Sequence, residues 1–345
     1  VAAVVDGKDV ASASYTLDCT DAMLPRKVLI EEFTTASCGN CPAAHRMLST
    51  VSADRDDMIV VAHHSGFGVD NYTTTLDQSY LWFYQISSWA PAFMMDRVNF
   101  ADQGAVAPSG MSYVSTPGPV LSVSSADELE KFVNLAADRY AWLDVNIDYT
   151  YDADTRKLDV EVSGTPVKTL DEWTNPSVSV FLVERSDVSY QSGVSGGYTH
   201  RHIFRESLTG DLGQLVELKK GEPYSCKVST TIDEKLDAAD LDIVAFVGNA
   251  NGSDANDCKV FNAASVAIDI PSTGIDTVTG ESFVVTGGDG MITVSGTFSH
   301  AAVYALNGAE VAAFDEAGYV NVAAGVYLVK VTTVGEVNTR KVVVK

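Results

Sequence analysis

The stretch VLIEEFTTASCGNCP, residues 28–42, constrains the fold of this chain more than any other segment. A short apolar run ends at Phe33, a small polar turn follows, and Cys38 and Cys41 stand two residues apart. After the turn, apolar residues recur at helical spacing, at Ala44, Met47, Leu48 and Val51. Both sulfurs are therefore expected at a helix N-terminus, where unpaired N–H groups and the helix dipole favour a thiolate. This pattern predicts dithiol–disulfide exchange.

Length and charge exclude several classes of protein. At 345 residues the chain exceeds one ordinary core, so we expect two or three domains. A formal net charge of −23 argues against binding of nucleic acid, whose phosphates need a basic surface, and against adhesion to anionic lipid. No apolar run approaches the roughly 20 residues that span a bilayer.

The first part of the chain, residues 1–26, is expected to hold a lead-in strand around Ser14–Leu17. These residues do not read as a signal peptide, because no basic flank precedes an apolar core. Two expectations follow: a cytosolic protein, or an exported one whose signal lies upstream of residue 1. The C-terminal region, described below, favours the second.

Residues 27–141 alternate between strand and helix patterns and are expected to form one α/β domain. Ser125 and Glu128 supply a capping box for the last helix of this region. The expected strands are 28–33, 58–63 and a short run after Pro91, and the expected helices are 42–52, an aromatic one at 76–87, and one carrying Leu129, Phe132, Val133, Ala136 and Tyr140 on one face.

From Leu143 onward the hydrophobic period changes from 3.6 to 2, which indicates strands. Residues 142–270 carry regular short strands without helices, so an immunoglobulin-like antiparallel β-sandwich is expected there. A linker, IPSTGID, leads to a last all-β module within 271–345, in which Asn307-Gly308 is the signal of a tight hairpin turn. The predicted fold is thus α/β plus all-β, in three parts.

The CxxC stretch resembles the active-site strand and helix of the thioredoxin superfamily. Glu32 lies six residues before the first cysteine, where thioredoxins keep a buried acid, and Pro91 fits the cis-proline that lies against the disulfide in this fold. The resemblance implies a thioredoxin-like domain over 27–141, with Cys38 as nucleophile, Cys41 as resolving thiol, and Glu32 as the group that relays a proton to Cys41. Trp89 and Ala90, just before Pro91, are expected to bind substrate.

Two further resemblances concern the rest of the chain. Residues of about 20–270, with EEFT, CGNCP, the proline strand and YTHRHIFRE, are similar to the twenty-eight-kilodalton outer membrane protein family of Bacteroidetes. The ending GVYLVKVTTVGEVNTRKVVVK looks like the C-terminal sorting domain of Por-type (type IX) secretion in the same phylum. Together they imply a protein of the cell envelope (outer membrane, surface or periplasm) or a secreted one.

Five cysteines occur in the chain, and three lie outside the CxxC. Cys226 and Cys258 lie in matching contexts, SCKV and DCKV, and are expected to bridge neighbouring strands if their Cα atoms come within ~7 Å. A free cysteine there is the open alternative. Cys19 is left unpaired.

Alternative sites remain open at this point. Cys38 and Cys41 together with His45, His63 and His64 have the ligand types of a zinc site but not the spacing of a zinc ribbon, so we expect no metal and no cofactor. His200 and His202 alternate along a strand that we expect to pack or contact a partner.

Two functions from different classes compete. The first is an exported thiol–disulfide oxidoreductase whose partners are protein thiols or disulfides. The second is a non-catalytic surface or adhesion protein on a retired thioredoxin scaffold, associated with the outer membrane. The sequence indicates no oligomeric state.

Overall fold

The computed structural model describes residues 2–5, 8–12, 24–84, 89–107, 118–269, 283–288, 290–305, 308–333 and 337–344. The chain divides into two compact units, Val1–Ile268 and Asp269–Lys345, and each is described by itself. The predicted strand at 14–17, Cys19, the predicted linker at 270–276 and Asn307 lie outside the described residues.

The first unit is built mostly of strands, with three α-helices and three short 3₁₀ turns in its described part. Its elements are β1 (Ala2–Val5), β2 (Lys8–Ser12), β3 (Val28–Thr34), α1 (Cys41–Ser52), β4 (Met58–His64), α2 (Thr75–Phe83), β5 (Ala92–Met95), η1 (Ala101–Gln103), α3 (Ala126–Ala137), β6 (Asn146–Asp152), β7 (Lys157–Gly164), β8 (Pro176–Ser189), β9 (Tyr198–Ser207), β10 (Gln214–Leu215), β11 (Tyr224–Thr231), η2 (Ala238–Asp240), β12 (Leu241–Asn249), η3 (Ala255–Asp257) and β13 (Val260–Ala267).

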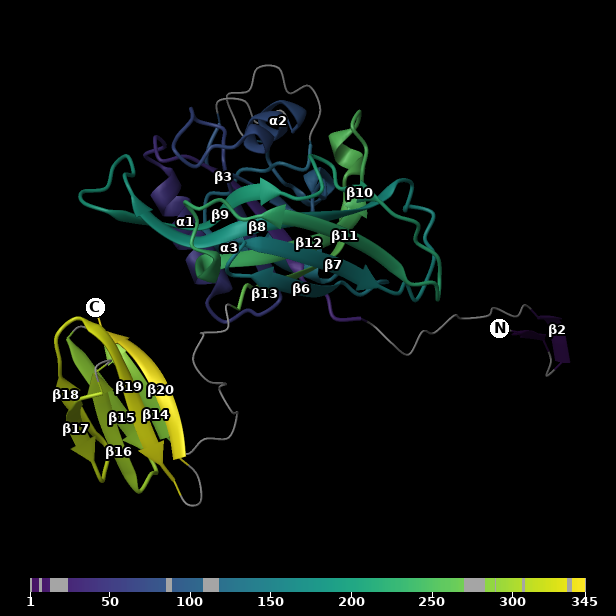
Figure 1. The fold of residues 1–345 in the computed structure, drawn as a ribbon. Coiled ribbons are helices and arrows are strands. Elements are labelled where there is room, and N and C mark those ends of the chain that lie inside the picture. The colour runs from purple at the N-terminus through teal and green to yellow at the C-terminus, as the bar shows by residue number, and fades with distance from the viewer. Residues whose placement is uncertain are drawn as a thin grey trace. The chain divides into compact units, whose positions relative to one another are not determined.

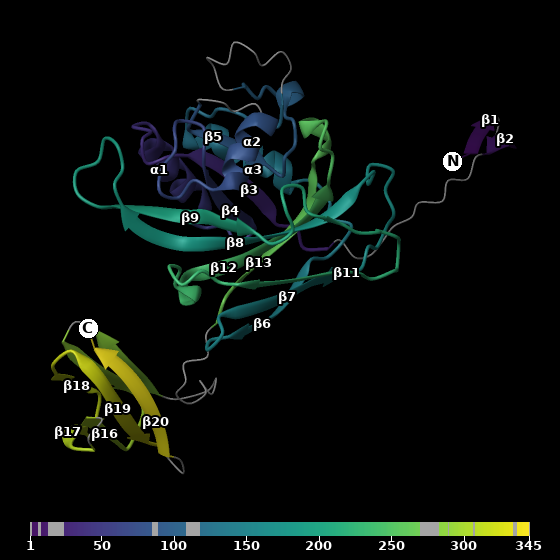
Figure 2. The ribbon, with the colours of Figure 1, turned by 45° about the horizontal axis from the view of Figure 1, so that its top comes forward.

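One eight-stranded sheet runs through most of this unit, in the order β13-β12-β8-β9-β4-β3-β5, with β10 paired to β8 (Figures 1 and 2). Strands β3 and β4 are parallel, as expected for a strand–helix–strand crossover. Strand β9 joins β4 in parallel through Ala62 and Ile203. The sheet therefore contains strands from both sides of the domain boundary that the sequence places at 141/142. The change of hydrophobic period at that boundary indicates strands but does not reveal which strands pair.

Helices cover both faces of the α/β end of this sheet. Helices α1 and α3 bury their apolar faces against Val28 and Ile30 of β3, while α2 packs on the opposite face against Leu29 and Phe33. In α2 the aromatic residues divide, because Tyr80 is buried and Trp82 is 72% exposed. The expected aromatic helix therefore packs on the core through Tyr80 and not through Trp82.

The ends of the helices follow local signals. The Ser125 side chain accepts a hydrogen bond from the Glu128 backbone at the start of α3, as predicted, but the Glu128 carboxylate bonds Ser124 instead of closing the box on Ser125. Helix α2 has a complete capping box between Thr74 and Asp77.

A second, three-stranded sheet in the order β11-β7-β6 lies beside the β12–β13 end of the large sheet in both views (Figures 1 and 2). Strand β7 alternates buried and less buried residues, which is the pattern of a strand with one covered face. The first strands expected from the period of two that begins at Leu143 form an antiparallel hairpin of β6 and β7.

The second unit is all-β in its described residues, as predicted, and its two sheets share one apolar core. The sheets have the orders β14-β15-β18 and β17-β16-β19-β20. The strands are β14 (Phe283–Gly288), β15 (Met291–Gly296), β16 (His300–Ala305), β17 (Glu310–Phe314), β18 (Gly318–Asn321), β19 (Gly325–Thr332) and β20 (Val337–Val344). At this level the fold is the predicted combination of α/β and all-β structure.

Candidate functional site

The two cysteines of the CxxC motif lie at the junction of a strand and a helix. Cys38 occupies the turn after β3, and Cys41 is the first residue of α1. The two are joined by a disulfide, with their Cα atoms 5.5 Å apart. The Cys41 backbone N–H points back to Cys38, 3.2 Å from its Sγ. The predicted pairing of these two cysteines is confirmed.

The segment before β5 lies against this disulfide. The Ala90–Pro91 bond is cis, as the resemblance to thioredoxins implies, and the Cys38 Sγ lies 3.5 Å from the Ala90 carbonyl oxygen. Trp89 is partly buried and packs on the core cluster of Leu29 and Phe33. The structure thus brings Pro91, Ala90 and Cys38 together from segments far apart in the chain.

The loop between β8 and β9 covers the disulfide, a feature that sequence reasoning missed. The fully buried Gln191 side chain donates through Nε2 to the carbonyl oxygens of Cys38 (2.7 Å) and Thr35 (3.3 Å), and the Ser192 N–H donates to the Ala36 carbonyl (2.8 Å). Cys38 is consequently 3% exposed and Cys41 is 0% exposed. An attacking nucleophile is expected to be exposed, but Cys38 is buried, and Gln191 of this loop, 153 residues away in sequence, bonds its carbonyl.

Glycine gives this covering loop its shape. Gly193 has φ of +80° and approaches the Gly39 carbonyl oxygen, from which an added Cβ would lie 3.6 Å away. Gly196 also has a positive φ, a conformation that side chains with a Cβ rarely adopt. The sequence GVSGG at 193–197 was the signal that could have indicated a tight loop here, although not what the loop contacts.

Glu32 and His45 form a pair on the α1 side of the sheet. The Glu32 carboxyl is buried, and burial raises its pKa to about 8. Its Oε1 lies 3.3 Å from the His45 Nε2, yet makes no hydrogen bond within the described residues. The His45 Nδ1 lies 2.5 Å from the Tyr198 hydroxyl, and burial lowers the His45 pKa to about 3. Both members of the pair are therefore neutral at pH 7.

A hollow lies beside this pair, and we call it the α1–β9 cavity. It is lined by Glu32, by α1 between His45 and Ser52, and by β9 between Tyr198 and His202, with a volume of about 290 Å³. His202 has a positive φ of +56° and is partly buried. His200, by contrast, is buried beside His64 and Tyr72. His202 therefore lines the cavity, whereas His200 is part of the buried interior.

The opposite face of β3 holds a charged network that the sequence analysis did not identify. The His63 Nδ1 lies 2.9 Å from Asp77 and its Nε2 lies 3.2 Å from Glu31, while Arg97 binds both oxygens of Glu31 at 2.7 Å. All these side chains are at most 3% exposed. Tyr80 accepts a further hydrogen bond from Arg97 (2.9 Å).

This network keeps its members charged. Burial by itself would raise the pKa of Glu31, but the Arg97 guanidinium outweighs it and the pKa falls to about 2. For His63, burial opposes the charged form, and the hydrogen bonds to Asp77 and Glu31 outweigh it, so the pKa is raised. Arg97 also stacks over the Tyr80, Tyr84 and Phe246 rings, with distances of 4.9–5.7 Å to the ring centres.

The predicted bridge between Cys226 and Cys258 is wrong, because both thiols are free. Cys226 lies on β11, which pairs with β7 in the three-stranded sheet, whereas Cys258 precedes β13 in the large sheet. Each thiol is satisfied locally: Cys226 contacts the Gln214 side chain at 3.5 Å and Cys258 the Asn251 carbonyl at 3.4 Å. Burial raises the pKa of both thiols, which makes them poor nucleophiles.

The three histidines weighed as zinc ligands do not gather at the cysteines. His63 belongs to the charged network, His64 pairs with Asp70 at 2.7 Å, and His45 lies in the α1–β9 cavity. Within the described ranges, no group of three or more His, Cys, Asp or Glu side chains is arranged to hold a metal ion. None of the helices described is long and apolar enough to cross a membrane.

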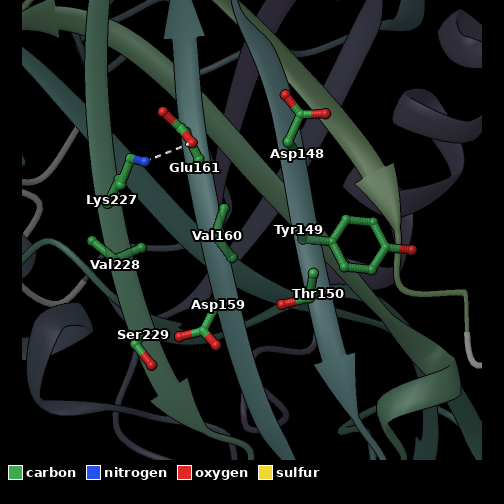
Figure 3. A pocket seen from close by; sticks show the side chains of 9 residues that line it. All are labelled: Asp148, Tyr149, Thr150, Asp159, Val160, Glu161, Lys227, Val228 and Ser229. Atoms are coloured by element: carbon green, nitrogen blue, oxygen red, sulfur yellow. Dashed lines mark ion pairs between the residues drawn. The ribbon is translucent and has the colours of Figure 1, made fainter.

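A second hollow, of about 440 Å³, lies on the three-stranded sheet (Figure 3). Its charged side chains come from β6, β7 and β11, and the Lys227 ammonium pairs with Glu161 at 3.0 Å. Asp148 and Asp159 lie in the same hollow. None of the residues predicted to act in the site lies there.

Comparison with known proteins gives a partial match to one family. A model of the family described as outer membrane protein Omp28 matches residues 122–271. That range contains α3 and the β-rich part of the first unit and leaves out the CxxC motif, so it is shorter than the resemblance over about 20–270 that the sequence suggested. No curated protein matches this chain.

One solved structure shares the fold of this chain. HBP35 of Porphyromonas gingivalis is similar over 93% of this chain and 99% of its own, with 20% identity and a TM-score of 0.57. A domain of the outer membrane lipoprotein Omp28 from Porphyromonas gingivalis matches 37% of this chain and 89% of its own, at 22% identity and a TM-score of 0.24, too low to support an argument. The first likeness shows a common fold and nothing about activity.

Proposed function

We propose that this chain is a cell-envelope or secreted protein that carries out thiol–disulfide exchange through Cys38 and Cys41 on a thioredoxin-like domain. One observation carries the proposal: the disulfide at the start of α1 lies against the segment of Ala90 and Pro91, with the Cys38 Sγ 3.5 Å from the Ala90 carbonyl. The match to the Omp28 outer membrane family supports the location. The likeness of the C-terminal unit to a sorting domain rests on its all-β fold and its sequence.

The proposed reaction oxidises a client dithiol. A client thiolate attacks the Cys38 Sγ, a bond forms between the client sulfur and Cys38, and the Cys38–Cys41 bond breaks with its electron pair moving to Cys41. A second client thiolate then attacks the mixed disulfide, which releases an oxidised client and leaves Cys38 reduced. The two protons of the client thiols end on Cys38 and Cys41. Glu32, protonated at pH 7 and beside His45 of α1, is the proposed relay: it gives its proton to Cys41 and regains one from a client thiol.

Exchange requires the covering loop to move. Gln191 holds the Cys38 carbonyl, and Cys38 as a residue is 3% exposed. In this proposal a client sulfur reaches Cys38 only when the loop at 190–197 separates from the Ala36–Gly39 turn. Local opening of this kind involves a few hydrogen bonds and costs less free energy than global unfolding. Ala90, whose carbonyl lies 3.5 Å from the Cys38 Sγ, and its neighbour Trp89 are the proposed client-binding residues.

A Cys41→Ser variant tests the chemistry directly. With the resolving thiol removed, Cys38 should form a stable mixed disulfide with oxidised glutathione, detected as a mass increase by mass spectrometry. Cys38→Ser, which leaves the buried Cys41, is the matched control and should react far more slowly. Equal labelling of the two variants, or none in either, would contradict the proposal.

The burial of Cys38 favours a second candidate from another class. In it, the disulfide is a permanent brace of a binding or adhesion protein, and the loop of Gln191 is part of its rigid surface. This candidate predicts that folded Cys41→Ser protein stays unlabelled and that envelope association survives the loss of both cysteines. Fractionation of a Cys38→Ser/Cys41→Ser strain tests the second point.

A further inference from the structure

The α1–β9 cavity has a buried carboxyl group that nothing in the described structure satisfies. The side chain of Glu32 is 3% exposed, and its Oε1 has no hydrogen bond among the described residues. The neighbouring His45 Nε2 lies 3.3 Å from this oxygen, but it also lies 3.1 Å from the Thr34 hydroxyl and hydrogen-bonds there instead. A buried oxygen without a partner costs free energy, and such groups in native proteins call for an explanation such as a bound molecule.

The charges around the cavity point to the kind of molecule. Arg46 from α1 and Arg201 from β9 both line it, both are exposed, and neither side chain forms an ion pair in the part of the chain that the structure describes. In a protein with a net charge of −23, two arginines without acidic partners in one hollow are unexpected. Because Glu32 and His45 are neutral at pH 7, the lining carries a net positive charge.

The rest of the lining supplies hydrogen-bonding groups. The Tyr198 and Ser49 hydroxyls and the Thr199 side chain surround the same space. The volume of about 290 Å³ is near the lower end of pockets that hold small molecules, roughly 300–1,000 Å³.

We propose that the α1–β9 cavity binds a small organic anion whose carboxylate or phosphate group pairs with Arg46 and Arg201 and whose hydroxyl group hydrogen-bonds Glu32. Guanidinium groups bind both kinds of anion through charge-assisted hydrogen bonds, so the chemistry is shared by sugar acids and small phosphate esters. The site shares Glu32 with the proposed proton relay to Cys41, but no ligand atom has to reach Cys38 or Cys41, so binding can be measured with the disulfide intact.

Isothermal titration calorimetry of the intact, oxidised protein tests the site with two probes, gluconate and glycerol 3-phosphate. Ionic strength is held near 0.15 M so that loose attraction to surface charge is screened. We expect saturable 1:1 binding of at least one probe, and the probe that binds tells whether the site prefers carboxylate or phosphate. Erythritol, which has hydroxyls and no charge, should not bind.

Variants then locate the site. Arg46→Gln and Arg201→Gln should each weaken binding by about tenfold or more, since a charged hydrogen bond is lost. Lys235→Gln removes an exposed positive charge elsewhere and should leave the affinity unchanged. Glu32→Gln keeps a neutral hydrogen-bonding group and should retain binding, whereas Glu32→Leu should lose it.

The proposal fails on either of two results. One is the absence of saturable binding of both probes up to about 10 mM. The other is binding that Arg46→Gln and Arg201→Gln leave unchanged while their circular dichroism shows them folded. Because the protein stays oxidised throughout, failure here leaves the exchange chemistry of Cys38 untouched, and failure of that chemistry leaves this site untouched.

Discussion

Glu31 and Glu32 are neighbours on β3, and the two faces of the sheet give them opposite properties. Glu31 is held by Arg97 and His63, and its pKa falls to about 2. Glu32 has a neutral histidine beside it and no cation in contact, and burial raises its pKa to about 8. Both carboxyls are buried, so burial does not decide the charge; the presence of a paired cation does.

The difference separates a structural face from a face suited to chemistry or binding. On the Glu31 face the charges are matched and hydrogen-bonded, as buried ions must be. On the Glu32 face an unpaired oxygen, a cavity and the disulfide-bearing helix α1 are adjacent. Perturbed, unsatisfied groups of this kind cluster at functional sites.

The largest expected effect concerns the Glu31 face. Arg97→Met removes the cation and leaves Glu31 buried without a partner, so the free energy of unfolding should fall by about 3–5 kcal/mol. Urea unfolding followed by circular dichroism measures it. The control is Arg55→Met, which breaks the partly exposed pair with Asp57 and should cost at most about 1 kcal/mol. Equal losses in the two variants would mean that the charged network is not a structural element.

The next effect is a pH dependence that arises from Glu32. Its pKa is higher in the folded state (about 8) than its ordinary value of 4.5, so between these values the folded chain holds a proton that the unfolded chain releases. Stability should therefore fall as pH rises, by about 1.4 kcal/mol per pH unit from this group. The Glu32→Gln variant should lack this component, and the difference between the two urea-unfolding curves from pH 5 to 8 isolates it.

Glu31 should show the reverse sign in a different window. Its pKa is lowered from 4.5 to about 2, so its contribution is present above pH 4.5 and is lost as pH falls toward 2. His63, whose pKa is raised, contributes stability that is fully present below its ordinary pKa of 6.5 and is lost as pH rises through the raised value. This is why the Glu32 component is read from the difference between wild type and Glu32→Gln. A difference that does not change with pH would contradict the assignment of a neutral Glu32.

A smaller effect tests whether opening of the loop that carries Gln191 controls access to the disulfide. Gln191→Ala removes two hydrogen bonds to the Thr35 and Cys38 carbonyls, which should make local opening easier by about 1.4 kcal/mol and raise the rate of disulfide reduction by dithiothreitol about tenfold. Quenching with an alkylating agent and mass spectrometry give the rate. Gln103→Ala, at an exposed position in η1, should leave it unchanged. An unchanged rate in Gln191→Ala would show that this loop does not control access.

Sequence patterns predicted the parts of the fold that depend on local interactions. The strand, turn and helix around Cys38 and Cys41 follow from an apolar run and from Ala44, Leu48 and Val51 at helical spacing. The cis bond before Pro91 followed from the resemblance to thioredoxins. The identity of pairing strands did not follow, because β4 meets β9 through Ala62 and Ile203, which are 141 positions apart by their numbering.

The missed features of the site depend on contacts between distant segments. Arg97 lies 66 residues from Glu31, and Gln191 lies 153 residues from Cys38, so no local pattern marks either contact. The prediction of a bridge between Cys226 and Cys258 failed for the same reason. Similar flanking residues do not indicate which sheet each cysteine joins.

The most direct test of the account is the reduction potential of the Cys38–Cys41 disulfide, measured by equilibrating the intact protein in dithiothreitol and glutathione redox buffers and counting free thiols. The account predicts reversible reduction with a potential of roughly −120 to −270 mV, the range of proteins that exchange disulfides. A bond that stays oxidised at potentials below about −300 mV, as structural disulfides do, would contradict it.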